Sequence, residues 1–166
     1  SSSSQIMMDD THSVDAPLTQ LAAPQRKRRQ VVEAAARLFM AQGYGATSMD
    51  AIAREAGVSK ATLYAYFPGK DALFAAIVGE ACERESEGRP CCPGMDGGDL
   101  AATLLSLGEG YLSFLYREEV LAIQRVVMAE GPRFPELGRA FYESGPRRMI
   151  GWLTGWFTTL QEKGAL

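Results

Sequence analysis

Histidine is almost missing from this sequence, because its one histidine, His12, lies in a polar N-terminal segment. Ser-His-Asp and Cys-His catalysis both use a histidine as the base, so its scarcity argues against hydrolases of those types. The chain also lacks a glycine-rich phosphate loop after a strand-like run and lacks histidine-rich metal spacings. We therefore expect no enzyme activity, no catalytic residues, no metal and no cofactor.

Cysteine is scarce too, with Cys82, Cys91 and Cys92 as the only three. An odd number without a secretory signal argues against a disulfide framework. Cys91 and Cys92 are adjacent and have no C-x-x-C partner, which argues against a zinc site. We interpret all three as thiols in or near a loop; a redox-sensing role stays open.

Long apolar runs are absent, since none approaches the roughly 18 residues that a membrane helix needs. Residues 1–15 have neither the basic start nor the apolar stretch of a signal peptide. We therefore expect no membrane partner and a cytoplasmic location. Strand-like alternation of useful length is missing as well, so the sequence predicts an all-α fold.

The charge is distributed unevenly. Residues 24–70 carry eight Lys or Arg against three acids, a net charge of +5, and the whole chain carries −3, which leaves −8 for the rest. A basic module joined to an acidic one is typical of a phosphate-binding head on a body that stays off DNA. A solvated basic helix end gives the same count, and charge alone does not separate the two.

Helical periodicity and turn residues divide the chain into segments. Residues 1–24 are polar and contain two prolines, so we expect a flexible tail. Glycine and proline recur from Glu87 to Asp99, which predicts a loop. The expected helices cover about residues 25–42, 49–56, 60–67, 71 onward, 100–116, 118–130, 135–144 and 146–163.

The second and third of these helices are short and joined by a tight turn. Gly57 ends the second, and Ser59 offers an N-cap to the third only two residues later. Two short helices joined in this way form the helix-turn-helix arrangement. A generic pair of helices produces the same pattern. Only the side chains of the third helix can distinguish a DNA-binding motif from such a pair.

The third helix has a core side and an outer side. Leu63 and Phe67 point the same way, toward a core, while Ala61, Thr62 and Ala65 lie opposite. Small residues let a helix backbone come close to base edges, and Thr62 offers a methyl and a hydroxyl for reading them.

Polar side chains surround that outer side. Tyr64 and Tyr66 lie on its two flanks, where phenol hydroxyls reach the phosphates of both groove walls. Lys60 lies in the first turn, where a recognition helix meets DNA. In an arbitrary helix, both tyrosines would simply border a small core.

The run from Thr47 to Leu73, TSMDAIAREAGVSKATLYAYFPGKDAL, is very similar to the TetR-family signature, and the similarity extends from about Arg26 to Phe74. This resemblance implies a three-helix DNA-binding head followed by a long connecting helix. It implies that Thr47 and Lys70 bind phosphate and that residues 26–29 are a basic lead-in beside the backbone. The DNA face that it implies consists of Ser59, Lys60, Ala61, Thr62, Tyr64 and Tyr66.

The run from Arg125 to Arg147, RVVMAEGPRFPELGRAFYESGPR, resembles the AefR-like ligand domains of that family. Family members usually continue beyond a position like Leu166 with one or two helices that build the dimer interface. We therefore expect the helical domain to be incomplete at this end. The predicted domains are a tail (1–24), a helix-turn-helix DNA-binding domain (25–70) and a helical-bundle domain for ligand binding and dimerisation (71–166).

Aromatic and soft apolar residues are plentiful after residue 100, and helical bundles often enclose an apolar ligand cavity. The candidate ligand residues are Tyr111, Phe114, Met128, Phe141 and Trp152. For any one of them, ordinary packing explains the residue equally well.

The predicted function is a ligand-responsive regulator, most simply a repressor. Its expected partners are a palindromic double-stranded DNA operator, a small-molecule effector and a second copy of the chain. The alternatives are a helical protein-interaction module, or a sensor that no longer binds DNA, on the same fold. An enzyme built on a helical bundle is a third class, without a catalytic constellation to support it.

Overall fold

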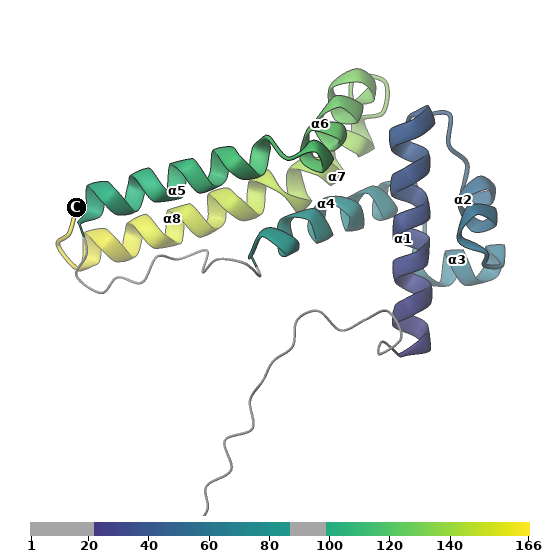
Figure 1. Ribbon diagram of the computed structural model, residues 1–166, viewed down its shortest axis with the longest axis horizontal. Helices are drawn as coiled ribbons and strands as arrows, with labels where there is room; N and C mark the ends of the chain where they lie inside the picture. Colours follow the sequence, from purple (N-terminus) through teal and green to yellow (C-terminus); the bar gives the residue numbers. More distant parts are fainter. Residues whose placement is uncertain (1–21, 87–98) are drawn as a thin grey trace, which may run out of the picture.

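The computed structural model describes residues 22–86 and 99–166. Within those ranges the chain forms helices and no strands, which confirms the all-α prediction (Figure 1). The predicted tail up to residue 21, the loop residues 87–98 and with them Cys91 and Cys92 lie outside the described residues. The helices are α1 (Ala23–Gln42), α2 (Met49–Ala56), α3 (Lys60–Tyr66), α4 (Lys70–Ser86), α5 (Leu100–Leu115), α6 (Glu118–Glu130), α7 (Pro135–Ser144) and α8 (Pro146–Glu162).

The predicted helix boundaries around the turn between α2 and α3 are confirmed in detail. The Ser48 hydroxyl accepts a hydrogen bond from the Ala51 N–H, and the Ser59 hydroxyl accepts one from the Thr62 N–H. Gly57 adopts a left-handed conformation with φ of 67°, which a residue without a Cβ takes at little cost. These local contacts begin α2 after Ser48, end it at Gly57 and begin α3 after Ser59.

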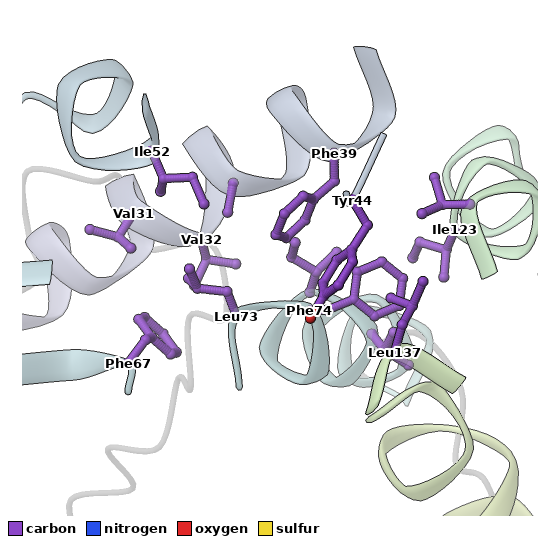
Figure 2. Close-up of a cluster of buried hydrophobic side chains, with 14 of the residues drawn as sticks. Val31, Val32, Phe39, Tyr44, Ile52, Phe67, Leu73, Phe74, Ile123 and Leu137 are labelled. Carbon is purple, nitrogen blue, oxygen red and sulfur yellow. The ribbon is translucent and has the colours of Figure 1, made fainter. Parts of the chain in front are cut away.

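One buried apolar cluster connects the first four helices to α6 and α7 (Figure 2). Val31, Phe39 and Leu63 have no exposed surface, and burying such a side chain contributes roughly 1.5–3 kcal/mol. Ile123 from α6 and Leu137 from α7 belong to the same cluster. The packing is therefore continuous across residue 70, where the sequence predicts a domain boundary.

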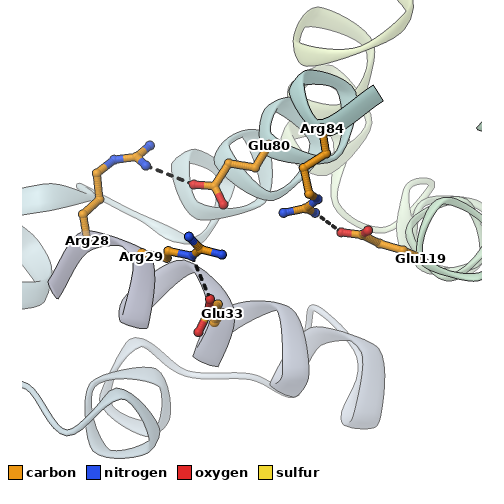
Figure 3. Close-up of polar contacts among 6 residues, drawn as sticks. All are labelled: Arg28, Arg29, Glu33, Glu80, Arg84 and Glu119. Atoms are coloured by element: carbon orange, nitrogen blue, oxygen red, sulfur yellow. Dashed lines mark hydrogen bonds and ion pairs between the residues drawn. The ribbon is translucent and has the colours of Figure 1, made fainter. Parts of the chain in front are cut away.

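Helix α4 links the two ends of the molecule, because it packs against α1 on one side and α7 on the other. Ion pairs also join α4 to α1 and to α6 (Figure 3). Arg28 of α1 lies 3.0 Å from Glu80 of α4, and Arg84 of α4 pairs with Glu119 of α6. Such exposed pairs contribute little stability individually, so the buried cluster does most to hold these helices together.

Helices α5 and α8 extend away from α1–α3 (Figure 1). No residue of α5 is buried, and Leu105 and Leu112 are more than half exposed. In the described part of the chain, no helix is long and apolar enough to cross a membrane.

Candidate DNA-binding face and ligand cavity

Helix α3 presents the outer face that the sequence predicts. Leu63 is fully buried and Phe67 nearly so, whereas Lys60, Ala61 and Ala65 are exposed. Residues on this exposed side are small or polar, so the backbone of α3 can approach another surface closely. The arrangement suits a helix that enters the major groove of DNA.

The start of α3 is organised by polar contacts. The Ser59 and Thr62 hydroxyl oxygens lie 2.8 Å apart, so the two side chains orient each other. The Lys60 ammonium lies 2.8 Å from the Asp50 carboxylate, and this hydrogen bond raises the pKa of Lys60. Lys60 therefore stays charged, but Asp50 of α2 offsets its charge.

The two tyrosines of α3 differ in exposure. Tyr64 is 45% exposed, so its hydroxyl is accessible to a partner. Tyr66 is only partly exposed and packs against the buried cluster. Of the two predicted flanks, the one formed by Tyr64 is the more open.

Thr47 and Lys70, for which the resemblance implies phosphate binding, both serve the turn between α1 and α2. Thr47 is 2% exposed; its hydroxyl donates to the Gly43 carbonyl and accepts from the Gln42 side-chain amide. The Lys70 ammonium donates to the Tyr44 carbonyl at 2.8 Å and lies 4.5 Å from the centre of the Tyr44 ring. The Thr47 hydroxyl is thus engaged within the turn, and phosphate binding at Thr47 stays a prediction. Lys70 keeps two further N–H donors.

The basic lead-in, residues 26–29, lies in the exposed first turns of α1. Arg28 pairs with Glu80 and lies over the Phe67 ring, while Arg29 pairs with Glu33 (Figure 3). Arg28 is therefore held against Phe67 and α4, and Arg29 lies along α1 itself.

A cavity of about 100 Å³ lies between α4, α5, α6, α7 and the start of α8. Three of the five predicted ligand residues, Tyr111, Phe114 and Phe141, line it. Gln124 contributes an amide, and the lining contains no charged side chain. The full lining is Val78, Ala81, Cys82, Tyr111, Phe114, Leu115, Val120, Ile123, Gln124, Phe141, Gly145 and Pro146.

Comparison with known proteins identifies the family. The profile of bacterial regulatory proteins of the tetR family matches residues 31–77, and that of the AefR-like transcriptional repressor C-terminal domain matches residues 102–166. HTH-type transcriptional regulator YvkB of Bacillus subtilis is 30% identical over 139 residues, which are 83% of this chain and 69% of YvkB. This chain belongs to the TetR family. TetR-family regulators are helix-turn-helix proteins that bind DNA operators and typically act as dimers, and they are not enzymes.

Solved structures of the TetR family agree with the fold. The flavonoid-responsive regulator FrrA is 43% identical and superposes with a TM-score of 0.72 over 84% of this chain and 70% of FrrA. Other relatives match only in part: HTH-type regulator YuxN of Bacillus subtilis is 40% identical over 52 residues, 31% of this chain and 18% of YuxN. The chain thus spans less than a fifth of that relative.

Two predicted ligand residues of this TetR-family chain do not line the cavity. Met128 is 77% exposed, because it lies two residues after the buried Val126 and therefore about 200° around α6. Trp152 stacks on Trp156, with ring centres 6.0 Å apart, six residues beyond the Pro146 that lines the cavity. Both predictions rested on apolar character alone, which does not indicate which side of a helix faces the cavity.

Sequence reasoning missed the contacts that join the DNA-binding helices to α6. The Glu130 carboxylate, at the end of α6, accepts hydrogen bonds from the backbone N–H groups of Tyr44 and Gly45. Tyr44 is buried, with its ring edge-on to Phe134 at 5.4 Å. Burial raises the pKa of Tyr44, so its phenol stays neutral. The short sequence Gly43-Tyr44-Gly45 is the one local signal for such a close approach.

Proposed function

We propose that this chain is the DNA-binding head and part of the sensing domain of a ligand-responsive repressor. It binds a palindromic operator as a homodimer in the cytoplasm, and a small molecule releases it. Residues 25–70 form the DNA-binding domain, and residues 71–166 belong to the domain for ligand binding and dimerisation.

The observation that carries this proposal is the outer face of α3. Lys60, Ala61 and Tyr64 are exposed together there, on a helix whose opposite side is locked into the core by Leu63. A protein-interaction module has no need for so small and polar a helix face. One such helix reads only a few base pairs, so a two-fold dimer is needed to find one site in a genome.

The cavity supports an uncharged and largely apolar effector. A charged group buried without a partner loses its hydration at a high cost, and the lining offers no opposite charge. Gln124 and Tyr111 supply the hydrogen-bonding groups. Ligand sites usually occupy about 300–1,000 Å³, so the cavity must widen on binding. Helix α5, without a buried residue, is the wall that yields most easily. The flavonoid response named for FrrA fits this class of uncharged, largely apolar molecule.

Selection from random-sequence duplexes tests the DNA-binding part of the proposal. We expect rounds of binding to this chain to enrich two inverted half-sites about one helical turn apart. An enriched single half-site without symmetry, selected by a preparation that sediments as a dimer, would contradict the palindromic operator. No enrichment at all would contradict DNA binding and favour the protein-interaction alternative.

Release from the selected duplex tests the effector class. Flavone is the probe, and a flavone carboxylic acid is its charged control. We expect flavone to weaken operator binding and the carboxylic acid to have no effect. Release by the charged analogue alone would contradict the proposed class.

A further inference from the structure

Glu130 joins two parts of the chain that lie 85 residues apart. Its carboxylate oxygens lie 2.8 Å from the Tyr44 nitrogen and 2.6 Å from the Gly45 nitrogen. Both N–H groups belong to the turn of residues 43–47, between α1 and α2. One side chain of α6 therefore satisfies two neighbouring backbone donors of the DNA-binding head.

The position of Glu130 in its helix is unfavourable by itself. It is the last residue of α6, where the helix dipole is negative and disfavours a carboxylate. The two backbone N–H groups of the turn compensate, since hydrogen bonds to a charged acceptor are among the stronger ones. The contact to the turn thus explains why an acidic side chain is suitable at this end of α6.

The turn is shaped to receive α6 and the residues after it. A Cβ on Gly43 would lie 2.3 Å from a Glu130 carboxylate oxygen, and a Cβ on Gly45 would lie 2.7 Å from the Phe134 ring. Gly43 also has φ of 93°, a conformation that suits glycine. Two glycines therefore permit a close approach at two separate points.

The same turn positions the helices that face DNA. Its Tyr44 carbonyl accepts a hydrogen bond from the ammonium of Lys70, the first residue of α4. Its Thr47 hydroxyl donates a hydrogen bond to the Gly43 carbonyl. Helix α2 begins directly after it, at Met49. A displacement of the turn must therefore move α2 and, through their close packing, α3.

Helix α6 also forms a wall of the cavity, through Val120, Ile123 and Gln124. Gln124 and Glu130 are six residues apart, roughly 9 Å along one uninterrupted helix. A helix of this length moves as a unit, so a shift at the cavity reaches the carboxylate.

We propose that Glu130 is a positioning residue that transmits the state of the cavity to the DNA-binding helices. The inference rests on the proposed function, because it requires both a ligand cavity and a DNA-binding face. It adds the physical link between them: two backbone hydrogen bonds from the turn to the end of α6.

A cavity-filling substitution tests the link without a known ligand. Ala81→Leu adds volume to the cavity wall, and its effect on affinity for the selected duplex is measured with and without Glu130→Gln. We expect Ala81→Leu to weaken binding by about 5-fold or more when Glu130 is present, the range of ordinary allosteric coupling. In the Glu130→Gln background, the same change is expected to stay within about 2-fold.

Matched variants separate coupling from stability. Glu118→Gln removes an exposed carboxylate from the other end of α6 and should leave the effect of Ala81→Leu unchanged. If Glu130→Gln does not fold, Gly45→Ala disturbs the same contact from the side of the turn. If Ala81→Leu does not fold, Cys82→Met adds volume to the cavity wall in its place. If Glu130 had a purely structural role, Glu130→Gln would lower the melting temperature. Ala81→Leu would then weaken duplex binding by the same factor with and without Glu130.

Hydrogen exchange of the Tyr44 and Gly45 amides gives a readout that needs no DNA. We expect faster exchange in Glu130→Gln and in Ala81→Leu, and wild-type exchange in Glu118→Gln. If DNA binding fails but these rates change, the proposed function is wrong and the link stands. An equal effect of Ala81→Leu on affinity with and without Glu130, or unchanged amide exchange in Glu130→Gln, would overturn the inference.

Discussion

The Lys60 ammonium, in the first turn of α3, lies 2.8 Å from the Asp50 carboxylate at the start of α2. A cation at the DNA-facing end of a recognition helix is thereby held by an anion on the neighbouring helix. A phosphate that approaches Lys60 must compete with Asp50, and Asp50 itself repels the phosphate. On the proposed function, we therefore expect the pair to restrain binding to DNA in general.

Asp50→Asn should strengthen binding to unrelated duplexes, by several-fold at low salt, because one anion leaves the DNA-facing side. Glu55→Gln on the same helix is the control, since Glu55 is also exposed but pairs with Arg37 of α1. Fluorescence anisotropy with a scrambled duplex measures the effect. Equal affinities for Asp50→Asn and Glu55→Gln would show that the Lys60–Asp50 pair lies away from the DNA.

Thr62→Val keeps the shape of the side chain and removes the hydroxyl that lies 2.8 Å from that of Ser59. We expect a changed base preference at one position in each half-site, worth about 1–3 kcal/mol. Affinities for a set of single-base operator variants measure this preference. A uniform loss on every duplex would instead place Thr62 against the DNA backbone.

Thr47→Val removes a buried hydroxyl that makes two hydrogen bonds. Leaving the carbonyl of Gly43 without this donor should lower the free energy of unfolding by about 1–3 kcal/mol. Thr158→Val, which removes an exposed hydroxyl bonded to Thr154, should change it by less than about 0.5 kcal/mol. Denaturant unfolding compares the two, and similar losses would argue against the structural role of Thr47.

Cys82 reports on the cavity that it lines, and burial raises the pKa of its thiol. The thiolate is the reactive form, so alkylation by iodoacetamide at pH 8 should be on the order of tenfold slower than in the urea-unfolded chain. The rate should increase as the pH rises toward the raised pKa. The measurement uses a Cys91→Ser, Cys92→Ser background. Equal rates in folded and unfolded chains would contradict the partial burial of Cys82.

The sequence predicts most of the helices because their signals are local. Ser48, Gly57 and Ser59 act on their own neighbours, and the buried Leu63 follows from helical spacing within one short segment. The outer face of α3 could be predicted for the same reason. The family resemblance extends these local signals to the DNA-binding head as a whole.

Contacts between distant segments could not be predicted in this way. The pairing of Glu130 with Tyr44 joins positions whose separation in sequence carries no periodic signal. Met128 lies away from the cavity because the direction that α6 faces depends on how α4 and α7 pack against it. The resemblance placed Thr47 near phosphate, but the fold of the turn buries its hydroxyl.

A matched pair of tyrosines tests the central claim, that the outer face of α3 binds DNA. Tyr64 on α3 and Tyr142 on α7 are similarly exposed, at 45% and 49%. Affinity of Tyr64→Phe and Tyr142→Phe for the selected duplex is the measurement. The account predicts at least about a tenfold loss for Tyr64→Phe, because a hydrogen bond to a charged phosphate contributes about 1.5–3 kcal/mol, and no loss for Tyr142→Phe. Wild-type affinity in Tyr64→Phe, or equal losses in both variants, would contradict it.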